Sequence, residues 1–101
     1  MRLYIDTLDR DLLVIGLEDR IFKKKASYDK SQKLISFIDE LLKKEGKKVG
    51  DISEIEVNLG PGSFTGLRVG VAVAQAFSYA LGVPLNGKKL NTTDSIQIKY
   101  Q

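Results

Sequence analysis

GPGSFTGLRVG, residues 60–70, is the stretch of sequence that decides the fold. It follows Ile55–Leu59, where apolar residues alternate as in a buried strand. It leads into about Thr65–Leu81, whose Ala- and Gly-rich pattern predicts a helix. Glycines on both sides of Pro61 favour a sharp turn between these elements. The stretch therefore predicts a strand, a tight turn and a helix that begins directly after the turn.

The role of this turn is open to two interpretations. Free backbone N–H groups at the start of a helix can hold a phosphate or another anion. Alternatively, Gly66, Gly70 and Ala74 are spaced four apart, and small residues in that pattern let another backbone approach closely. The residues alone favour close packing over anion binding, with Ser63 and Thr65 predicted to cap the helix.

Several familiar loops are excluded. The sequence has no GxxxxGK[ST] loop, Thr65 stands where the dinucleotide fingerprint needs its third glycine, and Ser63 does not lie in GxSxG. The chain also contains no His and no Cys, which removes the commonest general base and any zinc–thiolate site or disulfide. We therefore predict no catalytic residue, no metal site and no cofactor.

The rest of the chain surrounds this stretch with further elements. Three β-rich runs, Leu3–Ile5, Leu12–Leu17 and Ile21–Ala26, precede Ser31–Glu45, where apolar residues recur with a helical period. Two short segments after the second helix, 83–85 and 95–100, each predict one more strand. The order indicates an α/β fold with a mixed sheet of about five strands and two main helices.

Composition is consistent with a single domain. The chain has 101 residues, 43% of them hydrophobic, and a net charge of +3. Its apolar runs are too short for a membrane span or a signal peptide, so we predict a cytoplasmic protein with no membrane contact. The lysine runs 23–25 and 43–48 are interspersed with acidic residues, which favours solvated faces over a nucleic-acid surface.

A family resemblance adds to this interpretation. Gly60–Gly70 resembles the signature of the TsaB (YeaZ) family almost letter for letter. Residues 5–7 are similar to the family's opening strand, 31–42 to its amphipathic helix and 82–85 to the segment after the signature helix. The resemblance covers residues 1–87, interpreted as a TsaB-like N-terminal half-domain. Residues 88–101 form a divergent tail, predicted to add an edge strand.

The resemblance implies a fold, a function and partners. The fold is a single actin-like (ribonuclease-H-like) half-domain. The implied function is a non-catalytic scaffold or dimerisation subunit of the bacterial machinery that makes threonylcarbamoyladenosine in tRNA. Its implied partners are the catalytic TsaD-type subunit and the TsaE-type ATPase, with tRNA contact only indirect or weak. The alternatives are a self-associating homodimeric module, or an enzyme (an ATPase or glycoprotease-like protein) that uses the Gly-rich loop.

The family pairs through the two helices of this half-domain, which nominates residues for partner contact. They are Leu34, Phe37, Ile38 and Leu41 on the first helix, and Gly66, Arg68, Val69, Gly70, Val73, Ala74 and Phe77 on the second. The competing interpretation is that about half of them serve the core of this small domain.

Nucleotide in the actin-like fold lies between two half-domains. The resemblance makes Asp6, Thr7, Gly60, Gly62 and Ser63 the candidate contacts in this half. We expect the contact to be weak, because the sequence ends at 101 without a second half and Leu8 replaces the family's Ser. Lys30 stands where the family usually has His, and Asp6 is predicted to cap a turn.

Overall fold

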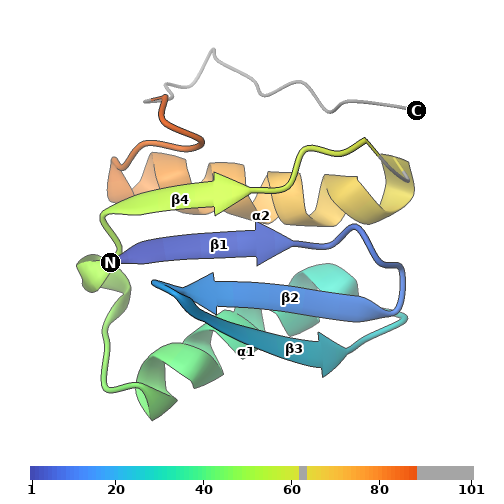
Figure 1. The fold of residues 1–101 in the computed structure, drawn as a ribbon, viewed down its shortest axis with the longest axis horizontal. Coiled ribbons are helices and arrows are strands. Elements are labelled where there is room, and N and C mark those ends of the chain that lie inside the picture. The colour runs from blue at the N-terminus through green and yellow to red at the C-terminus, as the bar shows by residue number, and fades with distance from the viewer. Residues whose placement is uncertain (62–63, 89–101) are drawn as a thin grey trace.

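The computed structural model describes residues 1–61 and 64–88. Its elements, in chain order, are β1 (Arg2–Asp6), β2 (Leu12–Leu17), β3 (Arg20–Lys25), α1 (Lys30–Lys44), a 3-10 turn (Val49–Asp51), β4 (Glu54–Val57) and α2 (Phe64–Leu81). The strands form one sheet in the order β3-β2-β1-β4 (Figure 1). β2 pairs antiparallel with β1 on one side and with β3 on the other, and β4 pairs parallel with β1. The predicted mixed α/β architecture is confirmed.

The predicted strand at 83–85 is reduced to single bridges. Leu85 bridges Ile55 in the parallel sense and Lys88 in the antiparallel sense. A longer strand cannot form here because Pro84 has no N–H to donate and Asn86 turns the backbone with a φ of 50°. The sheet of the described residues therefore has four strands rather than about five. The strand predicted at 95–100 lies outside the described residues.

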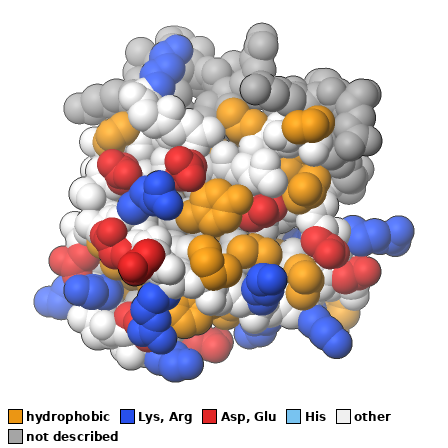
Figure 2. All heavy atoms as spheres, viewed as in Figure 1, with side chains coloured by type: hydrophobic (Ala, Val, Ile, Leu, Met, Phe, Trp, Pro, Cys, Tyr) orange, Lys and Arg blue, Asp and Glu red, His pale blue; other side chains and the backbone are white. Residues whose placement is uncertain are grey.

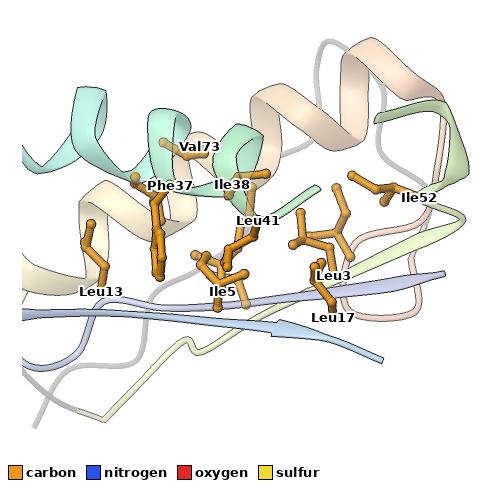
Figure 3. Close-up of a cluster of buried hydrophobic side chains, with 14 of the residues drawn as sticks. Leu3, Ile5, Leu13, Leu17, Phe37, Ile38, Leu41, Ile52 and Val73 are labelled. Atoms are coloured by element: carbon orange, nitrogen blue, oxygen red, sulfur yellow. The ribbon is translucent and has the colours of Figure 1, made fainter. Parts of the chain in front are cut away.

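The core lies between the sheet and the helices, both of which cover the same face of the sheet (Figure 3). Alternate residues of each strand point to this face, as a period of two requires. Leu3, Ile5 and Leu13 are fully buried there. From the helices, Phe37 and Leu41 point toward the sheet in Figure 3, whereas Val73 lies beside α1, farther from the strands.

A glycine follows the end of each helix. Gly46 follows α1 with a φ of 69°, and Gly82 follows α2 with a φ of 67°, the left-handed conformation that commonly ends a helix. Ser78 strengthens the end of α2, because its Oγ donates to the carbonyl of Val83 at 2.6 Å. At the start of α1, Asp29 occupies the N-cap position without a side-chain capping bond.

The opposite face of the sheet is covered by neither helix (Figure 2). Register places Tyr4, Gly16 and Ile21 side by side across it. Around these residues lie charged side chains, with Glu56 beside Tyr4 on β4 and Lys23 beside Val14 on β3. The mixture is typical of a solvated sheet face. No helix in the described part of the chain has the length and apolar character that a membrane crossing requires.

Candidate functional site

The two glycines of the signature helix pack against the end of β1. Thr7 is 1% exposed. Its Oγ1 donates to the carbonyl oxygen of Gly66 at 2.6 Å and accepts from the N–H of Gly70 at 3.0 Å. A Cβ added at Gly66 would lie 2.9 Å from the carbonyl oxygen of Thr7, and one at Gly70 would lie 2.7 Å from its Oγ1. This contact supports the packing interpretation for both glycines.

Asp6 organises the turn that follows β1. Its Oδ1 accepts from the N–H of Leu8 at 2.8 Å, and its Oδ2 accepts from the hydroxyl of Tyr4 at 3.1 Å. Burial, together with the negative charge and hydrogen bond of Asp6, raises the pKa of Tyr4 to about 12. Both carboxylate oxygens are thus occupied within the chain, in the turn-capping role that the sequence predicts.

Asn58, the residue directly after β4, anchors the start of the Gly-rich turn. Asn58 donates its N–H to the carbonyl of Ile5 at 3.0 Å, and its Oδ1 accepts from the N–H of Gly60 at 2.9 Å. Gly60 has a φ of 101°, a conformation that favours glycine. Gly62 and Ser63 lie outside the described residues, as does the side chain of Thr65. The predicted capping and nucleotide contacts of these residues therefore stay predictions.

A pocket of about 580 Å³ opens where α1 and α2 begin, next to the β1–β2 turn. Its lining includes Arg10, Tyr28, Lys30 and Val69. The Nζ of Lys30 donates to the carbonyl oxygens of Asp9 and Arg10, both at 3.0 Å. Burial lowers the pKa of Lys30, although Asp9 and Asp11 oppose that effect. Lys30, which stands where the family usually has His, therefore ties α1 to the β1–β2 turn.

The pocket and its surroundings lack the groups of a metal centre. Among residues 1–61 and 64–88, no three His, Cys, Asp or Glu side chains are grouped so that they could hold a metal ion.

Most of the residues nominated for partner contact lie in the core. Those exposed by 6% or less are Leu34, Phe37, Ile38, Leu41, Val73 and Ala74. They pack in one cluster with the inner face of the sheet. Gly66 and Gly70 are also buried. Of the nominated residues, Val69 and Phe77 are half-buried and Arg68 is exposed.

Apart from Arg68, the exposed residues in the described part of α2 were not among those nominated from the sequence. Ala72, Ala76, Tyr79 and Ala80 are exposed along one side of this helix, and Tyr79 is 59% exposed. Arg68 is the only charged residue in the 18 residues of α2. Exposed helix faces ordinarily carry charged side chains. The sequence signal that indicates this face is the near absence of charged residues over five helical turns.

An apolar groove separates this face from α1. It has a volume of about 320 Å³. Ile38 and Leu42, almost fully buried, form its base, and Ile35, Val49 and Phe77 line it toward solvent. Ile35 is 49% exposed, although it belongs to the same apolar run as buried Leu34. Phe77 is the residue of α2 that lines this groove.

The lysines are distributed over different faces. Lys23 and Lys25 project from β3 on the open side of the sheet, whereas Lys47 and Lys48 border the groove beside the helices. Lys24 and Lys43 lie 3.6 Å and 3.0 Å from the carboxylates of Glu40 and Asp39. This distribution favours the prediction that any tRNA contact is weak or indirect.

Comparison with known proteins identifies the family. The model of the TsaD family, described as tRNA N6-adenosine threonylcarbamoyltransferase, matches residues 21–91. The chain is 32% identical over 57 residues to the tRNA threonylcarbamoyladenosine biosynthesis protein TsaB of Escherichia coli, covering 56% of this chain and 25% of that protein. It is 43% identical over 51 residues to the protein of the same name from Buchnera aphidicola, covering 50% and 23%.

Solved structures agree with the sequence relatives. The structure of YeaZ from Pseudomonas aeruginosa matches with a TM-score of 0.70 and 26% identity, over 83% of this chain and 41% of that one. The chain thus spans about a quarter of the length of the curated relatives named above and two fifths of the solved one. The family model and these relatives show that the chain belongs to the tRNA N6-adenosine threonylcarbamoyltransferase (TsaD) family, and within it to the TsaB (YeaZ) proteins.

Proposed function

We propose that this chain is a non-catalytic scaffold subunit in the synthesis of threonylcarbamoyladenosine in tRNA, and that it pairs through α1 and α2 with a catalytic TsaD-type subunit. The names of its relatives, tRNA threonylcarbamoyladenosine biosynthesis protein TsaB, support the pathway. The observation that carries the pairing is the exposed face of α2, where Arg68 is the only charged residue, together with the apolar groove that Phe77 of the same helix lines.

The physical argument concerns the cost of leaving this surface in water. Ala72, Ala76 and Ala80 let a second helix approach α2 closely, and Tyr79 supplies a large amphipathic contact. Burying apolar area at such a surface releases about 25 cal/mol per Å². A partner helix packed along α2 would gain this energy without desolvating a row of charges.

The non-catalytic role is supported by the chemistry of the chain. The sequence offers no His or Cys to act as a base or a nucleophile. Within the described residues the hydroxyl of Thr7 is committed to two bonds with α2. We therefore expect the purified chain alone to turn over neither ATP nor peptide, and measurable turnover would contradict the proposal.

The decisive experiment mixes the chain with the TsaD-type subunit from the same source and measures the mass of the species by light scattering after size exclusion. We expect a heteromeric peak. Ala76→Glu, which places a charge on the exposed face of α2, should abolish that peak while the urea midpoint of the chain stays unchanged.

Ile21→Glu is the matched control, because Ile21 is a 55% exposed apolar residue on the opposite side of the molecule. It should leave the heteromer intact. Separate peaks for the unmodified proteins would overturn the pairing, and a dimer of the chain alone would support the homodimeric alternative.

A further inference from the structure

One edge of the sheet is closed by the chain itself. β4 is the last strand on that side, and Ile55 and Val57 direct their N–H and C=O groups away from β1. Ile55 donates to the carbonyl of Pro84 at 2.9 Å and accepts from the N–H of Asn86 at 2.8 Å. The side-chain amide of Asn86 accepts from the N–H of Val57 at 2.8 Å and donates to its carbonyl at 3.1 Å. An added strand would find no free backbone group on Ile55 or Val57.

The opposite edge is open. β3 is the outermost strand there (Figure 1), and a two-residue turn between Leu17 and Arg20 joins it to β2. In such a hairpin the closing pair exchanges hydrogen bonds, and bonded and non-bonded pairs then alternate along the ladder. The backbone groups of Ile21, Lys23 and Lys25 therefore point away from β2. Among the described residues, these outward groups have no hydrogen-bond partner.

The side chains of the same three residues give this edge its chemistry. They share one face of β3, as a period of two requires. Ile21 is 55% exposed, and Lys23 and Lys25 are exposed as well. In the part of the chain that the structure describes, no acidic side chain forms an ion pair with either lysine. Lys24 on the other face, by contrast, lies 3.6 Å from the carboxylate of Glu40.

A second copy of β3 is a poor partner for this edge. The strand reads RIFKKK, with four basic residues and no acidic one. Two such strands paired side by side would bring basic side chains opposite one another, and like charges in that position are destabilising. Lysines on an edge strand protect a sheet from pairing with copies of itself. An acidic strand would instead gain from the same lysines.

We propose that the β3 edge binds an extended acidic segment of a different protein, which adds to the sheet as an antiparallel strand. Acidic side chains of that segment lie opposite Lys23 and Lys25, and an apolar side chain lies opposite Ile21. Backbone hydrogen bonds to the outward groups of β3 supply affinity, and the lysines select the partner by its charge. This surface is separate from α1 and α2, so the inference does not depend on the scaffold function.

A short peptide tests the added strand. The probe is an end-capped peptide that contains Glu-Val-Glu-Val-Val, whose two glutamates face Lys25 and Lys23 in the antiparallel register while the last valine faces Ile21. Titrated into the ¹⁵N-labelled chain, it should shift the amide signals of these three residues. It should also slow their hydrogen exchange, because their N–H groups gain a partner. Shifts confined to other elements would overturn the proposal.

Methylation of the peptide nitrogens separates backbone pairing from charge. Antiparallel residues that exchange hydrogen bonds carry their side chains on the same face, so the nitrogens of the two glutamates face β3. Methyl groups on these nitrogens should abolish binding. Methyl groups on the second and fourth residues, whose nitrogens face away from β3, should leave it unchanged. Equal effects of the two methylated peptides would show that no strand is added.

Charge reversal gives an independent measurement. Lys23→Glu with Lys25→Glu should weaken the acidic peptide at least about tenfold, because each reversal replaces an attraction by a repulsion. A peptide with lysines in place of the glutamates should bind this double variant and not the unmodified chain. Lys47→Glu with Lys48→Glu is the matched control, since it changes the net charge equally beside the helices. If both double variants weaken the acidic peptide equally, only the overall charge matters and β3 is not the site.

Single-stranded RNA is the other polyanion that two neighbouring lysines could attract. A short oligouridine, titrated under the same conditions, should bind more weakly than the acidic peptide and should not slow the hydrogen exchange of Ile21, Lys23 and Lys25. The reason is that phosphate oxygens accept hydrogen bonds but cannot donate to the outward carbonyls of a strand. Tighter binding of the oligouridine at these residues would make the edge an RNA contact and overturn the proposal.

Discussion

The hydroxyl of Thr7 lies against Gly70, accepting a hydrogen bond from its N–H at 3.0 Å while donating to the carbonyl of Gly66 one turn earlier. The signature glycines therefore serve the contact between β1 and α2. A single buried hydroxyl at the end of β1 satisfies two backbone groups of the helix that follows the Gly-rich turn. This contact positions the start of α2 relative to the sheet.

Gly70→Ala is expected to destabilise the fold. The new Cβ would lie 2.7 Å from Thr7 Oγ1 and 3.3 Å from the Cγ2 of Ile5, and both neighbours are buried. Overpacking of this kind costs about 1–3 kcal/mol, against a gain of up to about 1 kcal/mol for replacing a helical glycine. We expect a net loss in the free energy of unfolding, measured by urea denaturation.

Gly50→Ala is the control for this substitution. A Cβ at Gly50 would meet nothing within 4 Å, so its effect should stay within about 0.5 kcal/mol. A Gly70→Ala variant as stable as the unmodified chain would show that α2 can move away from Thr7 at no cost.

Thr7→Val removes the hydroxyl and keeps the shape of the side chain. The N–H of Gly70 and the carbonyl of Gly66 would lose a partner in a buried site, which costs about 1–3 kcal/mol. Thr7→Ser keeps the hydroxyl and should retain most of the stability. A loss as large in Thr7→Ser as in Thr7→Val would assign the effect to the missing methyl group instead of the hydrogen bonds.

Hydrophobic period was sufficient to predict the element order. Short β-rich runs predict β1, β2 and β3, the alternation at 55–59 predicts β4, and the change to a helical period at Ser31 marks α1. The segment at 83–85 has the composition of a strand but forms only bridges, because its pairing depends on what Pro84 and Asn86 allow. The missing N–H of Pro84 is visible in the sequence, whereas the positive φ of Asn86 is visible only in the structure.

The candidate site was less accessible to sequence reasoning. The spacing of Gly66 and Gly70 indicates close packing but does not say whether the neighbour is a partner or the same chain, and the neighbour is Thr7. The apolar residues of α1 span a wide arc, and only the crossing of α2 decides which of them stay exposed. For this reason Ile35 and Tyr79 were missed, whereas the buried residues beside them were nominated.

The phenol of Tyr4 should titrate late. Burial and Asp6 raise its pKa from 10.0 to about 12, so the folded state favours the neutral phenol. The resulting stability is complete below pH 10 and is lost as the pH rises from 10 toward 12. We expect an ultraviolet phenolate step near pH 12 that is absent from Tyr4→Phe.

Asp6→Asn tests how much the carboxylate of Asp6 contributes to the raised pKa of Tyr4. Removing the negative charge should move the Tyr4 step to lower pH, although burial, the largest cause, keeps part of the rise. A step that stays in place in Asp6→Asn would show that the carboxylate does not act on the phenol.

Leu34 and Ile35 are neighbours in sequence with opposite roles. Leu34 is 0% exposed in the core, and Ile35 is 49% exposed at the groove. Leu34→Ala should lower the free energy of unfolding by about 2–5 kcal/mol, because the cavity it leaves cannot fill. Ile35→Ala should change the stability by no more than about 0.5 kcal/mol, while weakening binding to the TsaD-type subunit. Both quantities come from urea denaturation and a binding titration on the same preparations. If Ile35→Ala destabilised the chain as much as Leu34→Ala, Ile35 would belong to the core, and the outward face of α1 would have no apolar contact to offer a partner.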